Sequence, residues 1–275
     1  MNHAKPYDFK GRTAVITGAA SGIGRALAIA LAARGAHLAL VDRNEAQLAQ
    51  TVRFASGSGV RISSHLVDLA DASSIAALPA IVSETHPDVD IVVNNAGVAL
   101  GGLFEQVEPR DFDWLFDINF WGVVRMTRAF LPKLRKSDDA VLANVSSIFG
   151  IIAPPAQTAY SASKFAVRGF SQSLRAELSG TNVAVTVIYP GGVATSIAAT
   201  AREPMGTTPE QRERNKRLWQ KMLRMPPEEA AAIIVRGIER RRARILVGND
   251  AKIAAIAERC APVSYGRLLR LLNRR

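Results

Sequence analysis

The sequence predicts a doubly wound α/β fold, in which about seven parallel strands form a single Rossmann-like sheet with helices on both faces. Short apolar runs alternate with helix-forming segments along the chain, which is typical of repeated βαβ units. The apolar runs lack polar alternation, as expected when both faces of a sheet are buried. No composition break or linker divides the 275 residues, which indicates a single domain, 1–275.

The elements are predicted in order from residue 13. Residues 13–18 read TAVITG, a β-rich run ending at glycine; residues 23–35 are helix formers closed by Gly35, and residues 37–42 form the next apolar run. Strand, helix and strand within about 30 residues predict parallel strands joined by a right-handed crossover. The same rhythm predicts helices at 44–54, 71–84, 111–134, 159–179 and 228–239, and strands at 61–68, 90–97, 140–147, 183–192 and 243–248.

Composition excludes several protein classes. Hydrophobic residues make up 48% of the chain and charged residues 21%, which is ordinary for a globular protein, and no apolar run approaches the length of a membrane span. The N-terminal MNHAKPYDFKGR lacks the apolar core of a secretion signal, and the single cysteine, Cys260, cannot form an internal disulfide. We therefore expect a cytoplasmic protein.

The formal net charge of +11 is concentrated in the last quarter of the chain. Residues 202–275 hold 18 lysines and arginines against 8 acidic residues, whereas residues 1–201 are nearly balanced. A uniformly basic nucleic-acid binder would not show this distribution, and no finger, basic-zipper or RNA-recognition signature is present, so we expect no nucleic-acid partner. The four histidines (His3, His37, His65 and His86) are scattered and the cysteine has no partner motif, so the sequence predicts no metal site.

A glycine-rich turn follows the first predicted strand. Residues 17–24 read TGAASGIG, with glycines at 18, 22 and 24, and lead into the first helix. Such a turn lets the backbone approach a pyrophosphate, which the helix N-terminus then attracts with its N–H groups and dipole. The glycines alone also fit an ordinary tight turn between strand and helix, so the function needs further evidence.

An acidic residue ends the second predicted strand. Asp42 lies 24 residues after Gly18, close to where a carboxylate would accept the adenosine ribose hydroxyls of a dinucleotide. Because that carboxylate would repel a 2′-phosphate, we favour NAD over NADP, although the adjacent Arg43 could offset the repulsion and leaves NADP use open. The competing interpretation is that Asp42 caps the helix beginning near Asn44.

A tyrosine and a lysine lie four residues apart in the sequence YSASK, residues 160–164. In a helix this spacing places Tyr160 and Lys164 on one face, where a phenol and an ammonium can share a small volume. A cation beside a phenol lowers its pKa, so such a pair suits acid–base chemistry.

Taken together, these motifs resemble a classical short-chain dehydrogenase/reductase, with a match from about residue 10 to residue 197. The residues that carry the resemblance are TGAASGIG, Asp68 in LVD, NNAG at 94–97, Asn119 in DINFWG, the serines at 146 and 147, YSASK and YPGG. The resemblance implies a nicotinamide coenzyme held by Gly18, Ser21, Gly22, Ile23, Gly24, Asp42, Arg43, Asp68, Leu69, Asn95, Ala96, Gly97, Tyr160, Lys164, Pro190, Gly191, Val193 and Thr195.

The resemblance also implies a catalytic set of Asn119, Ser147, Tyr160 and Lys164. Family spacing puts the serine 13 residues before the tyrosine, which selects Ser147, and the strand period of two turns Ser146 to the opposite face. Tyr160 would exchange the proton with the substrate oxygen, Ser147 would donate to that oxygen, and Lys164 with the positive nicotinamide ring would lower the pKa of the phenol. Asn119 would hold a water path from Lys164, or it is simply a satisfied helix amide.

The substrate side is predicted from apolar residues outside the motifs. Residues 196–227 are expected to form a lid in which Leu218, Trp219, Met222 and Leu223 share one helical face, with core packing as the alternative. Ile148, Phe149, Trp121 and Trp219 are candidate pocket walls, which favours a bulky apolar alcohol or ketone of the retinoid, steroid or long-chain type. Alternatives are an NADPH-dependent 3-oxoacyl reductase acting on a carrier-protein or CoA substrate, and a dinucleotide-binding scaffold or sensor without turnover.

The last residues, 251–275, form a basic tail. Its closing part alternates leucines with arginines (Leu268, Leu269 and Leu272 against Arg267, Arg270 and Arg274), the pattern of a basic amphipathic helix. Such a helix packs on its own domain or a sister subunit, or else binds weakly to an anionic membrane surface. The resemblance implies a homodimer or homotetramer paired through the helices that carry Asn119 and Tyr160.

Overall fold

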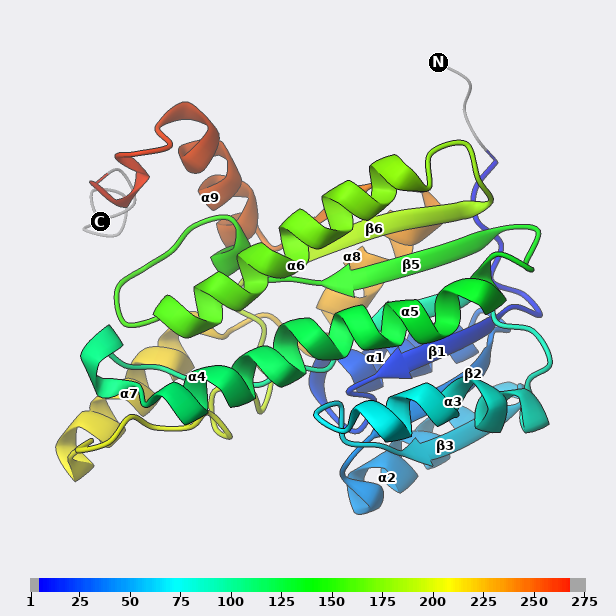
Figure 1. The fold of residues 1–275 in the computed structure, drawn as a ribbon, viewed down its shortest axis with the longest axis horizontal. Coiled ribbons are helices and arrows are strands. Elements are labelled where there is room, and N and C mark those ends of the chain that lie inside the picture. Colours follow the sequence, from blue (N-terminus) through cyan, green and yellow to red (C-terminus); the bar gives the residue numbers. More distant parts are fainter. Residues whose placement is uncertain (1–4, 268–275) are drawn as a thin grey trace.

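The computed structural model describes residues 5–267, which form one seven-stranded sheet in the order β3-β2-β1-β4-β5-β6-β7 (Figure 1). Every neighbouring pair of strands is parallel, so the predicted doubly wound sheet is confirmed. The strands are β1 (Thr13–Thr17), β2 (His37–Asp42), β3 (Ile62–Leu66), β4 (Ile91–Asn94), β5 (Ala140–Val145), β6 (Val183–Pro190) and β7 (Arg244–Val247).

The α-helices of this part of the chain are α1 (Gly22–Ala32), α2 (Glu45–Ala55), α3 (Ala72–Thr85), α4 (Pro109–Phe116), α5 (Gly122–Leu134), α6 (Thr158–Glu177), α7 (Pro209–Met222), α8 (Pro227–Glu239) and α9 (Asn249–Cys260). Single short turns add η1 (Ser56–Ser58), η2 (Phe104–Gln106), η3 (Asp117–Trp121) and η4 (Ile148–Gly150). Within residues 5–267 no helix is long and apolar enough to cross a membrane.

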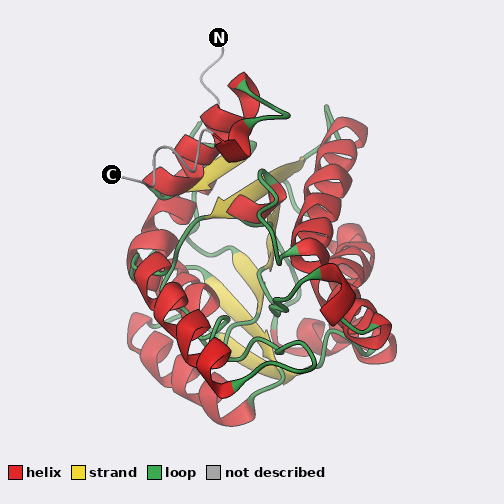
Figure 2. Ribbon diagram, turned by 90° about the vertical axis from the view of Figure 1, so that its left-hand side faces the viewer, coloured by secondary structure: helices red, strands yellow, loops and turns green. Residues whose placement is uncertain are grey.

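Helices cover both faces of the sheet (Figure 2). One core packs α1, α2 and α8 against one face of the strands, and a second core packs α3, α5 and α6 against the other. Because successive strand residues point to opposite faces, neighbours such as Ala14 and Val15 enter different cores. Burial on both sides explains why β1, β4 and β5 are buried along their whole length and mostly apolar.

Two predicted helices differ from their expected form. The segment expected as one helix from 111 to 134 is interrupted by the π-helical turn η3, which leaves α4 and α5 on either side. The lid helix α7 begins at Pro209 behind a capping box made by Thr208 and Gln211, and it ends at Met222, so Leu223 lies beyond it. Of the amphipathic tail residues, only Arg267 belongs to the described part of the chain, while Leu268, Leu269, Arg270, Leu272 and Arg274 lie outside it.

A cluster of three histidines lies at the β2–β3 side of the sheet. The Ser63 hydroxyl lies 2.7 Å from His65 Nε2 and 3.0 Å from His86 Nε2, and the His37 and His86 ring centroids are 6.5 Å apart. His86 is fully buried, and desolvation, with the nearby charges of Arg61, His37 and His65, lowers its pKa to about 4. The folded protein therefore holds His86 neutral at pH values where the unfolded chain protonates it.

We expect the protein to lose stability as the pH falls from about 6.5 to about 4. In this range the unfolded chain binds a proton at His86 and the folded chain does not, which costs on the order of 2 kcal/mol of folding free energy at pH 4. Chemical unfolding as a function of pH measures this loss. His86→Gln, whose amide can still bond to Ser63, should show a flatter dependence, and an equally steep curve would contradict the assignment.

Candidate active site

The strand order reverses at β1, whose neighbours are β2 on one side and β4 on the other. Loops after β1 and β4 therefore diverge to opposite faces of the sheet and leave a crevice at the strands' carboxyl ends, where open α/β sheets bind ligands. The glycine-rich turn, NNAG, Ser147 and YPGG all lie at the carboxyl ends of strands at this edge. The topology thus gathers every predicted motif at one place.

The glycine-rich turn has the shape of a phosphate cradle. Gly18 and Gly22 have positive φ angles of 67° and 54°, which residues with a side chain rarely adopt. A Cβ on Gly24 would overlap the Gly18 carbonyl oxygen, and one on Gly22 would lie 2.9 Å from the Thr195 methyl. The first turn of α1 carries no acidic residue, so its N-terminus fits the pyrophosphate of a dinucleotide.

The NNAG motif holds this cradle in place. Asn95 Nδ2 donates to the Thr17 carbonyl at 3.0 Å and to the Gly18 carbonyl at 3.3 Å. In return the Thr17 hydroxyl accepts the backbone N–H groups of Asn95 at 3.0 Å and Ala96 at 3.1 Å. The sequence analysis missed this role of Thr17, although its position at the strand end before Gly18 was a usable signal.

The Asp42 carboxylate, at the end of β2, accepts hydrogen bonds from the backbone on both sides. Its Oδ2 accepts the Ala20 N–H and its Oδ1 accepts the Asn44 N–H, each at 3.0 Å. The cap of α2 is Asn44, whose side chain accepts the Gln47 N–H, so the structure does not support the interpretation of Asp42 as the helix cap. The Asp42 carboxylate instead stands at the mouth of the cradle.

Two further adenosine candidates lie at neighbouring strand ends. Arg43 Nη1 is 3.8 Å from Asp68 Oδ2, and both side chains are about half exposed, so this pair is weak and the guanidinium is free to turn toward a ligand. Asp68 Oδ1 accepts the Ala70 N–H at 2.9 Å, and Leu69 beside it is buried.

The two serines after β5 point in opposite directions. The Ser146 hydroxyl donates to the Lys164 carbonyl at 2.8 Å and faces the core. The Ser147 hydroxyl accepts the Phe149 N–H at 3.1 Å and lies close enough to the Tyr160 phenol to lower its pKa. This alternation follows from the extended backbone, and it brings Ser147 and Tyr160 together from different elements.

Lys164 lies buried behind Tyr160, one turn further along α6. Its side chain is 3% exposed, its Nζ donates to the Val145 carbonyl at 3.2 Å, and Nζ lies 5.7 Å from the Tyr160 ring centroid. Desolvation lowers the pKa of Lys164 to about 8. Burial also raises the pKa of Tyr160 to about 12, opposed by the Ser147 hydrogen bond, so the expected lowering of the phenol pKa is absent in the chain alone.

Asn119 lies in the π-helical turn η3 and is completely buried. Its Oδ1 accepts the Val98 N–H at 2.8 Å, and its Nδ2 donates to the Val98 carbonyl at 3.0 Å and lies 3.3 Å from the Ser163 hydroxyl. A Cβ on Gly97 would lie 3.1 Å from Asn119 Oδ1 and 3.3 Å from Lys164 Nζ. The backbone of Val98 thus satisfies the Asn119 amide, and the side chains of Asn119 and Lys164 both lie close to Gly97. π-Helical turns recur at functional sites.

The loop after β6 closes the other end of the crevice. Pro190 is the last residue of β6, and two tight turns follow, in which Val193 N–H donates to Gly191 O and Thr195 N–H to Val193 O, each at 2.9 Å. The Thr195 methyl reaches Gly22, and the Ser196 hydroxyl lies 3.3 Å from that of Ser21. Residues 190–196 therefore meet the glycine-rich turn across the crevice.

An apolar wall flanks Tyr160. The Phe149 ring stands edge-on to the Tyr160 ring at 6.1 Å, and Ile148 packs against a neighbouring apolar cluster. On the other side a cluster from α4, α6 and the loop after β4 contacts Tyr160, with buried members Leu100, Leu115 and Ala159 and the partly buried Val98, Val107, Phe112, Trp114 and Phe116. Sequence reasoning missed these α4 aromatics, because helical spacing cannot distinguish a pocket wall from core.

Trp121 is a correction to the predicted pocket. It follows Asn119 by two helical positions, which turns its side chain to nearly the opposite face, and it is 47% exposed with its ring 5.1 Å from that of Phe120. Trp121 thus lies on the outer surface and does not reach the site. Trp219 is partly buried on α7.

The lid segment is fastened to the apolar wall. Arg202 lies over the Trp114 ring at 3.5 Å from its centroid, and its guanidinium pairs with Asp111 at 2.6 Å. Its backbone N–H also donates to the Ala99 carbonyl at 3.0 Å. These contacts place the start of the lid beside the helix that borders Tyr160.

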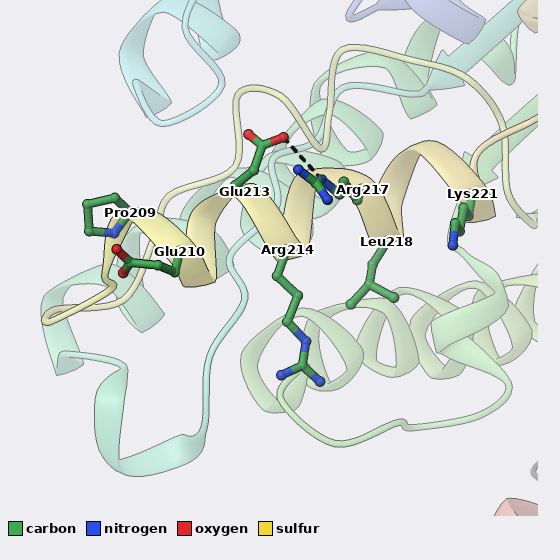
Figure 3. A pocket seen from close by; sticks show the side chains of 7 residues that line it. All are labelled: Pro209, Glu210, Glu213, Arg214, Arg217, Leu218 and Lys221. Carbon is green, nitrogen blue, oxygen red and sulfur yellow. Dashed lines mark hydrogen bonds and ion pairs between the residues drawn. The ribbon is translucent and has the colours of Figure 1, made fainter.

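A shallow hollow of about 590 Å³ runs along the outer face of α7 (Figure 3). Its lining is mostly charged, with Arg214, Arg217 and Lys221 next to Leu218, and it contains none of the predicted catalytic residues. It is therefore not the crevice described above. Among the residues that the structure describes, no group of histidine, cysteine and acidic side chains could hold a metal ion.

Comparison with known proteins identifies the family of this chain. The family model described as short chain dehydrogenase matches residues 12–206. SadH of Mycobacterium tuberculosis, provisionally named an oxidoreductase, is 41% identical over 264 residues, 95% of each chain.

Two solved structures have the same fold. A short-chain dehydrogenase/reductase from Burkholderia phymatum in complex with NAD is 29% identical, with a TM-score of 0.85 over 92% of this chain and 94% of the other. The alcohol dehydrogenase of Thermococcus sibiricus, complexed with 5-hydroxy-NADP, is 27% identical, with a TM-score of 0.73 over 86% and 94% of the two chains. The chain belongs to the short-chain dehydrogenase family of oxidoreductases.

Proposed function

We propose that the protein interconverts a hydrophobic secondary alcohol and its ketone, with NAD(H) as the preferred coenzyme. One observation carries this proposal: the phenol of Tyr160 lies beside Ser147 and in front of the buried ammonium of Lys164, at the edge of the sheet that carries the glycine cradle. A scaffold or sensor would need the cradle but would have no chemical use for the buried lysine and the phenol.

The coenzyme would lie across the crevice, with its pyrophosphate on residues 18–24, its adenosine between Asp42 and Asp68, and its carboxamide at Val193 and Thr195. When bound, it would accept or supply the hydride at the carbinol carbon. By family resemblance the transferred hydride is the pro-S one. The Asp42 carboxylate at the cradle favours the two ribose hydroxyls of NAD over the 2′-phosphate of NADP.

Tyr160 would exchange the proton of the substrate hydroxyl at its phenol oxygen. A phenol whose pKa is about 12 is a poor base near neutral pH, so it needs cationic charge beside it when the site is loaded. Lys164 would supply part of that charge from 5.7 Å, and Ser147 would donate to the substrate oxygen as negative charge develops on it. Asn119 would fix the loop at Val98 and Gly97 that faces the Lys164 ammonium.

The proposed substrate is apolar because the surroundings of Tyr160 are apolar. Phe149 on one side and the Leu100–Leu115 cluster on the other leave few polar partners for a substrate. An alternative is a 3-oxoacyl group on an acidic carrier protein or CoA, which the basic face of α7 favours. To distinguish the two substrate classes, turnover of simple apolar ketones is compared with turnover of a 3-oxoacyl thioester, each measured with NADH and with NADPH.

We also propose a homodimer or homotetramer paired through α4–α5 and α6. Aromatic side chains remain exposed on both, Trp121 at 47% and Phe165 at 37%, which suits a surface covered by a second copy. Sedimentation of the purified protein measures the assembly.

Tyr160→Phe should lower turnover by about 10²- to 10⁴-fold, because the variant loses the group that exchanges the proton. Coenzyme affinity should stay within about threefold, since the ring and its packing remain. Absorbance of the reduced nicotinamide measures the first and a binding titration the second. Tyr7→Phe, at a buried tyrosine whose hydroxyl bonds to Asp139 O away from this edge, is the matched control; equal turnover in both variants would refute the role of Tyr160.

Asp42→Asn should shift the preference between NADP and NAD by about tenfold toward NADP. The amide removes the charge that repels a 2′-phosphate while keeping an acceptor oxygen for the backbone N–H groups. The ratio of kcat/KM for the two coenzymes measures the shift. Asp88→Asn, at an exposed carboxylate, controls for the change in net charge; an unchanged ratio would remove Asp42 from coenzyme selection.

A further inference from the structure

Asp250, near the start of α9, lies against the loop that follows β6. Its Oδ2 accepts the Gly192 N–H at 2.6 Å, and its Oδ1 accepts the N–H of its neighbour Ala251 at 2.9 Å. A Cβ on Gly191 would overlap this carboxylate. The adjacent glycines of YPGG thus allow an acidic side chain from a distant part of the sequence to approach the backbone closely.

The same loop is held from its other side by the end of the lid. The Gly192 carbonyl accepts the N–H groups of Arg224 at 2.9 Å and Met225 at 3.0 Å, and Ala194 N–H donates to the Met225 carbonyl at 2.8 Å. A Cβ on Gly192 would overlap the Met222 carbonyl oxygen at the end of α7. The loop, the lid and the start of α9 therefore meet at Gly192.

This loop needs such external support. Its own hydrogen bonds are the two tight turns from Val193 N–H to Gly191 O and from Thr195 N–H to Val193 O, and its two glycines leave the backbone conformation weakly specified. A hydrogen bond from a backbone N–H to a carboxylate is about twice as strong as a neutral one. The Gly192 N–H makes such a bond, because it donates to the negatively charged Asp250 carboxylate.

We propose that Asp250 is a positioning residue that fixes residues 190–195 for the nicotinamide carboxamide and ties this loop to the lid. The proposal rests on the proposed function, because it takes Val193 and Thr195 to be the carboxamide site. Asp250 does not touch the coenzyme in this role; it acts through the Gly192 N–H. Its effect is therefore confined to the nicotinamide half of the coenzyme and leaves the adenosine half unchanged.

ADP-ribose separates these two halves, because it keeps the adenosine and pyrophosphate and lacks the nicotinamide. In Asp250→Ala we expect the Kd for NADH to rise about tenfold, equivalent to about 1.4 kcal/mol, while the Kd for ADP-ribose stays within about twofold. Asp250→Asn should fall between Asp250→Ala and the wild type, because its amide oxygen can still accept the Gly192 N–H but carries no negative charge. Asp8→Ala, at another exposed aspartate that accepts a backbone N–H, is the control.

Equal NADH affinity in Asp250→Ala and the wild type would overturn the proposal, as would parallel losses for NADH and ADP-ribose, which indicate a general loss of structure. A wild-type protein that binds neither ligand and shows no turnover would instead refute the proposed function itself. Normal wild-type binding and turnover with an unaffected Asp250→Ala variant would refute only the role of Asp250.

A double-mutant cycle gives an independent measurement. Gly191→Ala should weaken NADH binding in the wild-type background, because its Cβ meets the Asp250 carboxylate. In the Asp250→Ala background the same change should cost at least about threefold less, since the obstructing group is gone. Equal costs in the two backgrounds would show that the glycine and the carboxylate act independently, which contradicts the proposal.

Discussion

The proposed site depends on one buried ammonium group, that of Lys164. Lys164 is enclosed by β5, α6 and the loop after β4, and its Nζ donates to the Val145 carbonyl. Desolvation lowers its pKa to about 8, so at neutral pH the group is still mostly protonated. Its Nζ lies 5.7 Å from the centroid of the Tyr160 ring.

The other parts of the proposed site hold the side chains of Tyr160 and Lys164 beside the crevice at the carboxyl ends of the strands. Ser147 follows the end of β5, and the helix α6 contributes Tyr160, whose pKa the nearby Ser147 hydroxyl lowers. Thr17 and Asn95 join the loop after β4 to the loop after β1 by hydrogen bonds, so that the cradle and the proposed catalytic residues lie at one edge of the sheet. Preorganisation of this kind lets charge be stabilised without rearrangement during the reaction.

The lid joins this edge at both of its ends. Arg202 fastens its beginning to α4 through Trp114 and Asp111, and Met225 fastens its end to the loop after β6. Between them, α7 buries none of its residues. Few buried contacts therefore hold α7 between these two anchored ends.

The sequence by itself determined the sheet, the order of its elements and the position of the glycine cradle, because these depend on local patterns along the chain, and its family resemblance implied the roles of Ser147, Tyr160 and Lys164. Only the tertiary structure decided that Trp121 faces outward, that aromatics of α4 border Tyr160, and that the helix expected at 111–134 contains the π-helical turn that carries Asn119. The meeting of Asp250 with Gly192, 58 residues apart in the chain, likewise appears only when β6 and β7 lie side by side. Contacts of this kind depend on packing between distant segments, for which periodicity and motif spacing carry no signal.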